Sequence, residues 1–278
     1  MSTNAFPALP LAEWQDTRDT LTKYAKLLSE VRFALTPKQK HYWHLNLQIN
    51  VSGLTTMLIP APQNASVAAF EMQMNLQQHA LKVSTTDGTG MTLPLHGQLP
   101  HMLYLQTKKF LAERGIRLKL DANDFPETEM PYDKAAVERY WQALSNVAVV
   151  FGAFKAGLRG ESGPVSFWTH HFDLDLLWFS GRLVPGVDPK NAEHADEQMG
   201  FGFTTGDEVI AEPYFYATAY PLPKKLPSAK MPEGAAWQSE PWQGAVLKYE
   251  KLLTHPQPEK LLLGFLRGVQ KAAARLMR

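Results

Sequence analysis

Histidine and carboxylate side chains are the main candidates for chemistry in this chain, because its 278 residues contain no cysteine. The lack of thiols excludes disulfides, thiolate nucleophiles and Cys-ligated zinc or iron–sulfur sites. A metal would need His, Asp or Glu ligands, and covalent catalysis would need Ser, Thr, Lys or a carboxylate. The nine histidines are therefore the first residues to consider for metal ligation and for proton transfer near neutral pH.

Two histidines frame a tryptophan in the segment His41-Tyr42-Trp43-His44. A strand through this segment places the two histidines on opposite faces, so they share a ligand only if the chain turns there. One interpretation puts His41 in the core and His44 on a polar face. The other is a binding site that uses His41, Trp43 and His44 together.

A second polar group lies at residues 169–175. Strand alternation places His171, Asp173 and Asp175 on one face. One imidazole and two carboxylates suit a divalent cation, so these three residues are weak candidates for a metal site. A solvated polar row is equally typical of a sheet with one side in water. We otherwise expect no metal and no cofactor.

Common cofactor and nucleophile motifs are absent: the chain has no P-loop, no G-x-G-x-x-G and no G-x-S-x-G. Aromatic residues are instead concentrated in two predicted strands, which carry Tyr214, Phe215, Tyr216 and Tyr220, and Trp168, Phe172, Trp178 and Phe179. Because they occupy both faces of these strands, they indicate either burial on both sides or the wall of a pocket.

Four helices that position these residues are predicted from the hydrophobic period. They lie between Asp16 and Pro37, around residues 99–114, from Asp133 to about Phe151, and from Pro258 to the end of the chain. In the third helix, Trp141 and Leu144 lie in the middle of the apolar stripe and are expected to be buried.

A period of two predicts the strands, at residues 43–51, 70–76, 81–95 with an Asp87-Gly88 hairpin turn, 116–120, 165–179, 199–203 and 214–220. This mixture predicts an α+β fold with mainly antiparallel sheets backed by helices. Two long irregular loops are predicted at residues 121–132 and 221–241. They are either functional or only connections that run over the surface.

The two halves of the chain share landmarks at a nearly constant offset: Pro37 and Pro164, Met72 and Met199, and Pro94 and Pro221. These landmarks favour two similar halves, residues 1–132 and 133–278, packed as one unit. The strand parities disagree, because Leu45 and Leu47 fall opposite Asp173 and Asp175, so an internal duplication stays open.

Composition is globular, with 45% hydrophobic residues and 28 basic against 27 acidic side chains. The formal net charge of +1 lacks the strong field of a typical nucleic-acid binder. No stretch reaches the roughly 20 apolar residues of a membrane span. The first residues lack the basic start of a secretory signal. We therefore expect a cytoplasmic protein whose partner is a small molecule rather than a nucleic acid or a membrane.

Several rare-residue patterns together resemble a bacterial family known only as a domain of unknown function. The patterns are Phe6-Pro7-Ala8-Leu9-Pro10-Leu11 with Trp14, Asp16-Thr17 and Thr20-Leu21, then His41-x-Trp43-His44, Phe172-Asp173-Leu174 and Phe179-Ser180-Gly181-Arg182. The resemblance covers nearly the whole chain and implies no activity. Its polar motif residues here are His41, Trp43, His44, Asp173, Arg182 and Glu197. The chain departs from the pattern at Ser166, Asp196 and Thr204-Thr205.

Arg182 follows a Ser-Gly turn, which allows two roles. Its guanidinium either pairs with a carboxylate, for which Asp173 is available, or holds an anionic ligand.

The leading hypothesis is a cytoplasmic small-molecule-binding protein with an aromatic pocket. Its polar anchors are drawn from His41, His44, Asp173, Arg182 and Glu197. The first alternative is a metal-dependent or acid–base hydrolase that adds His171 and Asp175 to these residues. The second is a non-catalytic protein-interaction module.

Overall fold

The computed structural model describes residues 6–277, and its α+β fold is divided between two units. The amino-terminal unit comprises residues 14–141 and 167–171. The carboxy-terminal unit comprises residues 6–13, 142–166 and 172–277. The expected division into residues 1–132 and 133–278 stays a prediction. No helix among residues 6–277 is long and apolar enough to span a membrane.

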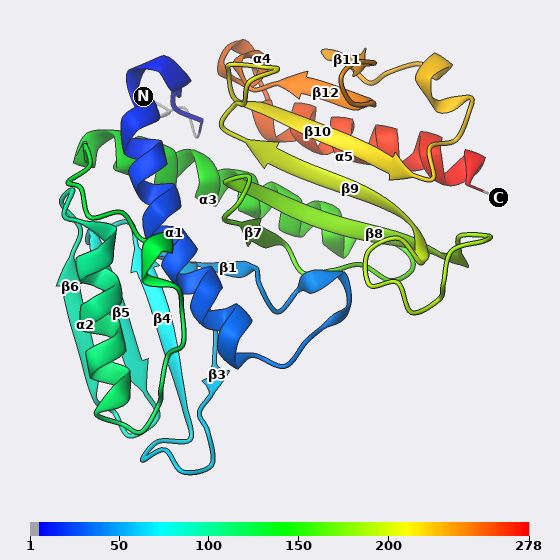
Figure 1. Cartoon of the computed structure of the whole chain (residues 1–278). Coiled ribbons are helices and arrows are strands. Elements are labelled where there is room, and N and C mark those ends of the chain that lie inside the picture. Colours follow the sequence, from blue (N-terminus) through cyan, green and yellow to red (C-terminus); the bar gives the residue numbers. More distant parts are fainter. Residues whose placement is uncertain (1–5, 278) are drawn as a thin grey trace. The chain divides into compact units, whose positions relative to one another are not determined.

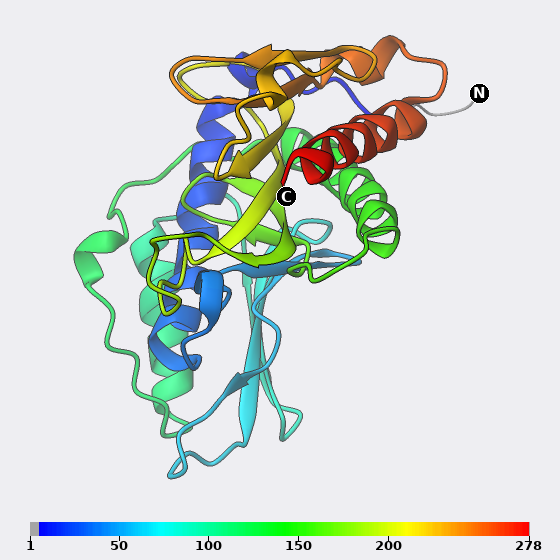
Figure 2. The same ribbon diagram turned by 90° about the vertical axis from the view of Figure 1, so that its right-hand side faces the viewer.

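The amino-terminal unit is an antiparallel sheet covered by helices. Its elements are α1 (Gln15–Leu35), β1 (Leu47–Asn50), β2 (Gly53–Thr55), β3 (Ile59–Pro60), β4 (Ala69–Asn75), β5 (Ala80–Thr85), β6 (Gly90–Pro94), α2 (Pro100–Ala112) and the start of α3 (Lys134–Ala156). The strand order is β1-β2-β4-β5-β6, with β3 on β4. Figures 1 and 2 show α1 and α2 on one face of this sheet.

The core of this unit follows the predicted periodicities. Phe70, Met72 and Met74 of β4 are fully buried, whereas Glu71 and Gln73 between them are not. The helix α1 buries Leu21, Tyr24 and Leu28 along one face. The alternation in β4 and the helical stripe in α1 are both confirmed.

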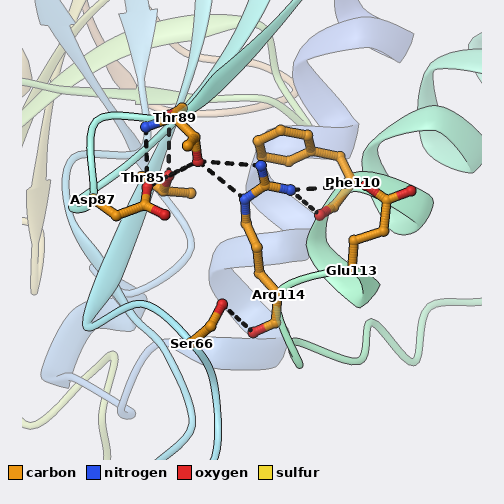
Figure 3. A network of polar contacts seen from close by, with 7 residues as sticks. All are labelled: Ser66, Thr85, Asp87, Thr89, Phe110, Glu113 and Arg114. Atoms are coloured by element: carbon orange, nitrogen blue, oxygen red, sulfur yellow. Dashed lines mark hydrogen bonds and ion pairs between the residues drawn. The ribbon is translucent and has the colours of Figure 1, made fainter.

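The predicted Asp87 hairpin joins β5 to β6, and α2 anchors its tip (Figure 3). The Asp87 carboxylate accepts hydrogen bonds from the hydroxyls of Thr85 and Thr89, at 2.5 and 2.8 Å. Arg114, just after α2, donates to the Thr89 hydroxyl and to the Phe110 carbonyl. Its guanidinium also lies 3.5 Å from the centre of the Phe110 ring, a cation–π contact.

The carboxy-terminal unit is also built around antiparallel strands. Its elements are the rest of α3, β8 (Asp173–Leu183), β9 (Asp196–Thr204), β10 (Tyr214–Tyr220), β11 (Ala235–Gln238), β12 (Gly244–Lys248), α4 (Glu250–Thr254) and α5 (Pro258–Leu276). The strand order is β8-β9-β10-β12-β11. Figures 1 and 2 show α5 along one face of this sheet, where it contacts β10 and β12.

Aromatic rings fill the core between this sheet and its helices. Phe154 of α3 meets Phe201 edge-on at 4.8 Å, and Phe203 packs on Phe215 at 5.0 Å. Leu262, Phe265, Leu266 and Val269 form the buried stripe of α5. The amphipathic pattern that predicted this helix from Pro258 is therefore confirmed.

The helix α3 begins and packs as its sequence indicates. The Asp133 carboxylate accepts a hydrogen bond of 2.9 Å from the Ala135 amide, which is the expected cap. Trp141 is 8% exposed and Leu144 is fully buried.

Two predicted strands are wrong in part, and a third does not form. The strand expected at residues 43–51 forms only as β1, because His41 and Tyr42 adopt left-handed φ values of 53° and 55° and turn the chain. The strand expected at residues 165–179 is interrupted between β7 (Ser166–Trp168) and β8, where Phe172 has a φ of 52°. No strand forms at residues 116–120, although Ile116 and Leu118 are buried.

The shared landmarks do not correspond strand by strand. Met72 and Met199 do lie on the comparable strands β4 and β9. In the first segment, however, β5 separates β4 from β6, whereas β9 pairs directly with β10. The two segments therefore do not match at one constant offset, and the internal duplication is not confirmed.

Candidate functional site

The His41–His44 segment forms a tight turn between α1 and β1. The buried Arg32 guanidinium of α1 donates to the carbonyls of Trp43, His44 and Thr56. The Ser29 hydroxyl donates to the next carbonyl of the turn, that of Leu45, at 2.8 Å. Burial lowers the pKa of Arg32. This part of α1 therefore holds the turn through consecutive backbone carbonyls.

Both histidines of this turn are buried, contrary to the interpretation that puts His44 on a polar face. His41 lies 5.4 Å from the Trp43 ring. The Nδ1 atom of His44 accepts a hydrogen bond from the Gln39 amide, so in the neutral ring Nε2 carries the proton. Burial and the positive charges of Arg32 and Lys38 lower the pKa of His44, which favours this neutral form.

The possible metal ligands do not share one strand face. His171 lies in the turn before β8, whereas Asp173 and Asp175 lie on β8 itself. The left-handed Phe172 breaks the alternation that would align all three. Across residues 6–277, no group of three or more His, Asp and Glu side chains lies close enough to hold a metal.

Asp173 belongs to an aromatic cluster on the sheet of the carboxy-terminal unit. The buried Tyr216 hydroxyl donates to its carboxylate at 2.5 Å. The Tyr216 ring lies where a side chain on Gly202 would stand, which explains the glycine there. Burial and the neighbouring carboxylates, Asp173 first, raise the pKa of Tyr216.

Arg182 pairs with Glu197, not with Asp173. Its Nη2 atom lies 2.6 Å from the Glu197 carboxylate, which also accepts a 2.5 Å bond from Ser180. Asp173 and Arg182 stand at opposite ends of β8, roughly 25–30 Å apart by strand length. The local ion pair is confirmed, but with a partner from β9 that the sequence did not indicate.

These residues are distributed over separate places. His41, Trp43 and His44 lie in the amino-terminal unit, and Asp173, Arg182 and Glu197 lie in the carboxy-terminal unit. None of the six lines either of the two cavities described next. A single site built from all of them stays a prediction.

The cavity of the carboxy-terminal unit has a volume of about 530 Å³. It lies between residues 209–212 and the β11–β12 hairpin, and it includes Trp237 in its wall. Its charged groups are already paired, since Lys248 lies 2.6 Å from Glu212 and Lys251 lies 3.6 Å from Glu250. These pairs leave the cavity little free charge with which to fix a ligand.

The cavity of the amino-terminal unit has a volume of about 440 Å³, and fewer of its polar side chains are already paired. Two loops form it, and they contribute His96, Gly97, Gln98, Glu129, Met130, Pro131 and Tyr132. The side chains of His96 and Glu129 make no hydrogen bond or ion pair with any other residue in the range 6–277. Both side chains are therefore available to a ligand.

A hydrogen-bonded chain runs from the wall of this cavity to Glu138, an exposed carboxylate of α3. The Tyr132 hydroxyl lies 3.1 Å from Nδ1 of His79, and Nε2 of His79 lies 3.4 Å from the Glu138 carboxylate. Burial, and then the neighbouring Tyr24, raise the pKa of Tyr132, so its hydroxyl keeps its proton near neutral pH. The arrangement joins a phenol, an imidazole and a carboxylate, as in sites that transfer protons.

The residues of this chain were not among the candidates from sequence. His79 lies in the turn between β4 and β5, Tyr132 ends the irregular loop at residues 121–132, and Glu138 lies on α3. One signal was present in the sequence, because that loop was singled out as too long for a simple connection. Nothing in the sequence indicated its contact with His79.

A comparison with models of protein families shows the family to which the chain belongs. The model of the family of unknown function DUF5996 matches residues 6–278. The chain belongs to this family. The match confirms the resemblance drawn from the sequence motifs.

The DUF5996 match extends over both of the units described above. Searches of curated proteins and of solved structures found no match to this chain. Since DUF5996 carries no described activity, the chemistry of this member has to be inferred from its geometry.

Proposed function

We propose that this protein binds a small polar molecule in the 440 Å³ cavity of its amino-terminal unit. The observation that carries the proposal is the chain Tyr132–His79–Glu138, which ends at the wall of that cavity. A cavity of this volume is within the usual range for small-molecule sites, about 300–1,000 Å³.

The lining indicates the chemical class of the ligand. Glu129 supplies a carboxylate and His96 an imidazole, and neither has another partner among residues 6–277. A carboxylate only accepts hydrogen bonds, so it favours a ligand with a protonated amine or with hydroxyl groups. Gln98 is less suited to bind the ligand, because its side-chain oxygen already accepts hydrogen bonds from the His96 amide and the Tyr24 hydroxyl.

A ligand screen tests this proposal. Native mass spectrometry of freshly purified protein would show a retained molecule, and ligand-observed NMR with a library of small amines and polyols would find weaker binders. We expect Glu129→Gln and Tyr132→Phe to weaken binding by at least about tenfold, which corresponds to about 1.4 kcal/mol.

Glu127→Gln is the matched control for Glu129→Gln. Glu127 belongs to the same loop but does not line the cavity, so its substitution should leave affinity unchanged. Finding no binder, or binders insensitive to Glu129→Gln and Tyr132→Phe, would contradict the proposal.

A second candidate function is acid–base catalysis in the same cavity, favoured by the same chain. In the neutral imidazole, Tyr132 donates to Nδ1 and the Nε2–H of His79 faces Glu138. A proton from a bound hydroxyl or ammonium group can then pass to the Tyr132 oxygen as the tyrosine proton moves to His79, so Tyr132 stays neutral while Glu138 stabilises the imidazolium. Compounds that bind should be followed for conversion by NMR. Conversion that is lost in His79→Gln while binding persists would establish an enzyme, and no conversion would leave binding alone.

We also propose that the protein acts in the cytoplasm and without nucleic acid. The absence of cysteine and the nearly balanced charge support this placement without requiring it. Cell fractionation tests the first point, and the absence of nucleic acid in the purified protein tests the second.

A further inference from the structure

The strands β8, β9 and β10 are neighbours in the carboxy-terminal unit (Figure 1), and one of their faces carries a repeated arrangement of side chains. Phe201 of β9 packs edge-on against Phe154 of α3, so its side chain lies on the face that α3 covers. Successive residues of a strand point to opposite faces, so Gly200 and Gly202 lie on the other face. The strand pairing places each glycine between one residue of β8 and one residue of β10.

The position above Gly202 is filled by a phenol of the protein itself. Gly202 pairs with Asp175 of β8 and with Tyr216 of β10. The Tyr216 ring crosses the glycine, and its hydroxyl donates at 2.5 Å to Asp173, the residue of β8 that lies diagonally across. A flat ring above a glycine and a carboxylate on the diagonal therefore form one complete unit of the arrangement.

The same arrangement recurs two residues along β9 at Gly200, but without a ring. Gly200 pairs with Leu177 of β8 and with Thr218 of β10, and Asp175 lies on its diagonal. Threonine is too short to cross the glycine as tyrosine does. A Cβ atom at Gly200 would lie 3.1 Å from the Thr218 hydroxyl and 3.7 Å from both the Asp175 carboxylate and the Leu177 side chain. Two oxygen atoms and one methyl group therefore border the space above Gly200.

Two polar groups beside Gly200 have no partner in the described chain. The hydroxyl of Thr218, a partly exposed residue, makes no hydrogen bond with any of residues 6–277. Gln198 is the next residue of β9 on the same face and is 9% exposed. Its Nε2 atom donates to the Glu193 carbonyl at 2.7 Å, but its buried Oε1 atom receives no hydrogen bond from residues 6–277. A buried acceptor without a donor is costly, so this face favours a ligand that donates.

Asp175 is the charged group at this position. A carboxylate only accepts hydrogen bonds, and its two oxygens together offer about four acceptor sites. Asp175 can therefore accept from a ligand in addition to its contacts within the protein. It selects a hydroxyl or another donor group, as Asp173 does in binding Tyr216.

Aromatic side chains border the position on both sides along β10. Tyr216 precedes Thr218 by two residues and Tyr220 follows it by two, so all three share one face. Both tyrosines are partly exposed. Flat rings pack well against aromatic side chains, so these neighbours favour a flat ligand.

We propose that the carboxy-terminal unit binds a phenolic ring above Gly200, with the phenol hydroxyl donating to Asp175 and accepting from Thr218. The ring takes the place that the Tyr216 ring takes above Gly202. A hydrogen bond from a hydroxyl to a carboxylate is among the strong ones. A sugar also carries hydroxyl donors, but its ring is not flat, and Leu177 offers its further hydroxyls no partner. This inference is independent of the cavity at Tyr132.

Titration of the full chain with para-cresol, followed by two-dimensional NMR of isotope-labelled protein, tests the proposal. We expect the amide signals of Gly200 and Thr218 to shift. The dissociation constant should rise at least about tenfold in Gly200→Ala, because the added methyl group fills the space that the ring needs. It should rise at least about threefold in Thr218→Val, which removes one hydrogen bond.

Thr218→Tyr tests the repeat itself. The added phenol should cross Gly200 toward Asp175, as Tyr216 crosses Gly202 toward Asp173. It should therefore occupy the position and abolish the binding of para-cresol. Binding that persists in this variant would contradict the proposed position.

Gly264→Ala is the matched control for Gly200→Ala, because a Cβ atom at this glycine of α5 would meet no atom within 4 Å. It should leave the dissociation constant unchanged, and circular dichroism should show that all variants fold. Cyclohexanol and methyl glucoside carry hydroxyls without a flat ring and should bind at least about tenfold more weakly than para-cresol. The proposal is overturned if para-cresol leaves the Gly200 and Thr218 signals in place, or if Gly200→Ala and Thr218→Val do not weaken binding. It is also overturned if cyclohexanol or methyl glucoside binds as tightly as para-cresol.

Discussion

At the scale of single residues, buried polar groups determine the local geometry of the amino-terminal unit. Arg32 is the clearest case, because one side chain binds carbonyls from the turn after α1 and from the end of β2. A carbonyl that loses its donor inside a protein costs about 1–3 kcal/mol. Fixing three of them explains how strained residues persist in the turn.

Arg32→Ala should therefore lower the free energy of unfolding by at least about 2 kcal/mol, measured by urea denaturation. Lys23→Ala on the same helix is the control, and as a substitution away from any such network it should stay within about 0.5 kcal/mol. A loss below about 1 kcal/mol for Arg32→Ala would show that water replaces the guanidinium.

Asp87 gives a residue-scale prediction about pH. The hydrogen bonds from Thr85 and Thr89 lower the pKa of Asp87 to about 2. Because this value lies below that of an unfolded aspartate, about 3.9, the carboxylate stabilises the hairpin fully above pH of about 4. That stabilisation is lost as the pH falls toward 2. An NMR titration should show the low pKa directly.

Substitution of the donor identifies the cause of the low Asp87 pKa. Thr85→Val removes the hydroxyl that donates to Asp87, so it should raise the pKa of Asp87. Thr92→Val, an exposed change on β6 of the same hairpin, should leave it unchanged. An equal shift in both variants would contradict the role of the Thr85 hydrogen bond.

At the scale of elements, α3 is stabilised by the apolar stripe that predicted it. Leu144 is fully buried at the centre of that stripe. Leu144→Ala should lower the free energy of unfolding by about 2–5 kcal/mol, through lost transfer energy and the cavity left behind. Gln142→Ala, an exposed change two residues earlier in the same helix, is the control. A change below about 1 kcal/mol at Leu144 would mean that the helix buries another face.

At the scale of the whole molecule, the balanced charge conceals an uneven distribution. The 40 residues from Val31 to Phe70 contain no carboxylate, whereas other segments are rich in carboxylates. The net charge of +1 is the sum over all of these segments. Long-range attraction depends on such local fields rather than on the sum. The cavity proposed as a binding site in the amino-terminal unit offers one such local charge, the carboxylate of Glu129.

The sequence by itself determined the elements whose signals are local. The period of 3.6 predicted α3 and α5, the Asp87-Gly88 pair predicted the β5–β6 hairpin, and alternation predicted β4. These signals need only residues a few positions apart, because turn chemistry and one-sided burial are set by nearby side chains. The α+β class followed from the same short patterns, whereas the family relationship was indicated by a resemblance in motifs of rare residues.

Tertiary structure decided which polar groups meet. The sequence offered Asp173 as a partner for Arg182, but the register of β8 with β9 brings Arg182 to Glu197 instead. It predicted a strand over residues 43–51, but side chains of α1 hold the start of that segment in a turn. His79 meets Tyr132 and Glu138 across 53 and 59 residues of chain. Contacts at such separations depend on how whole elements pack, and no local pattern of residue types encodes that packing.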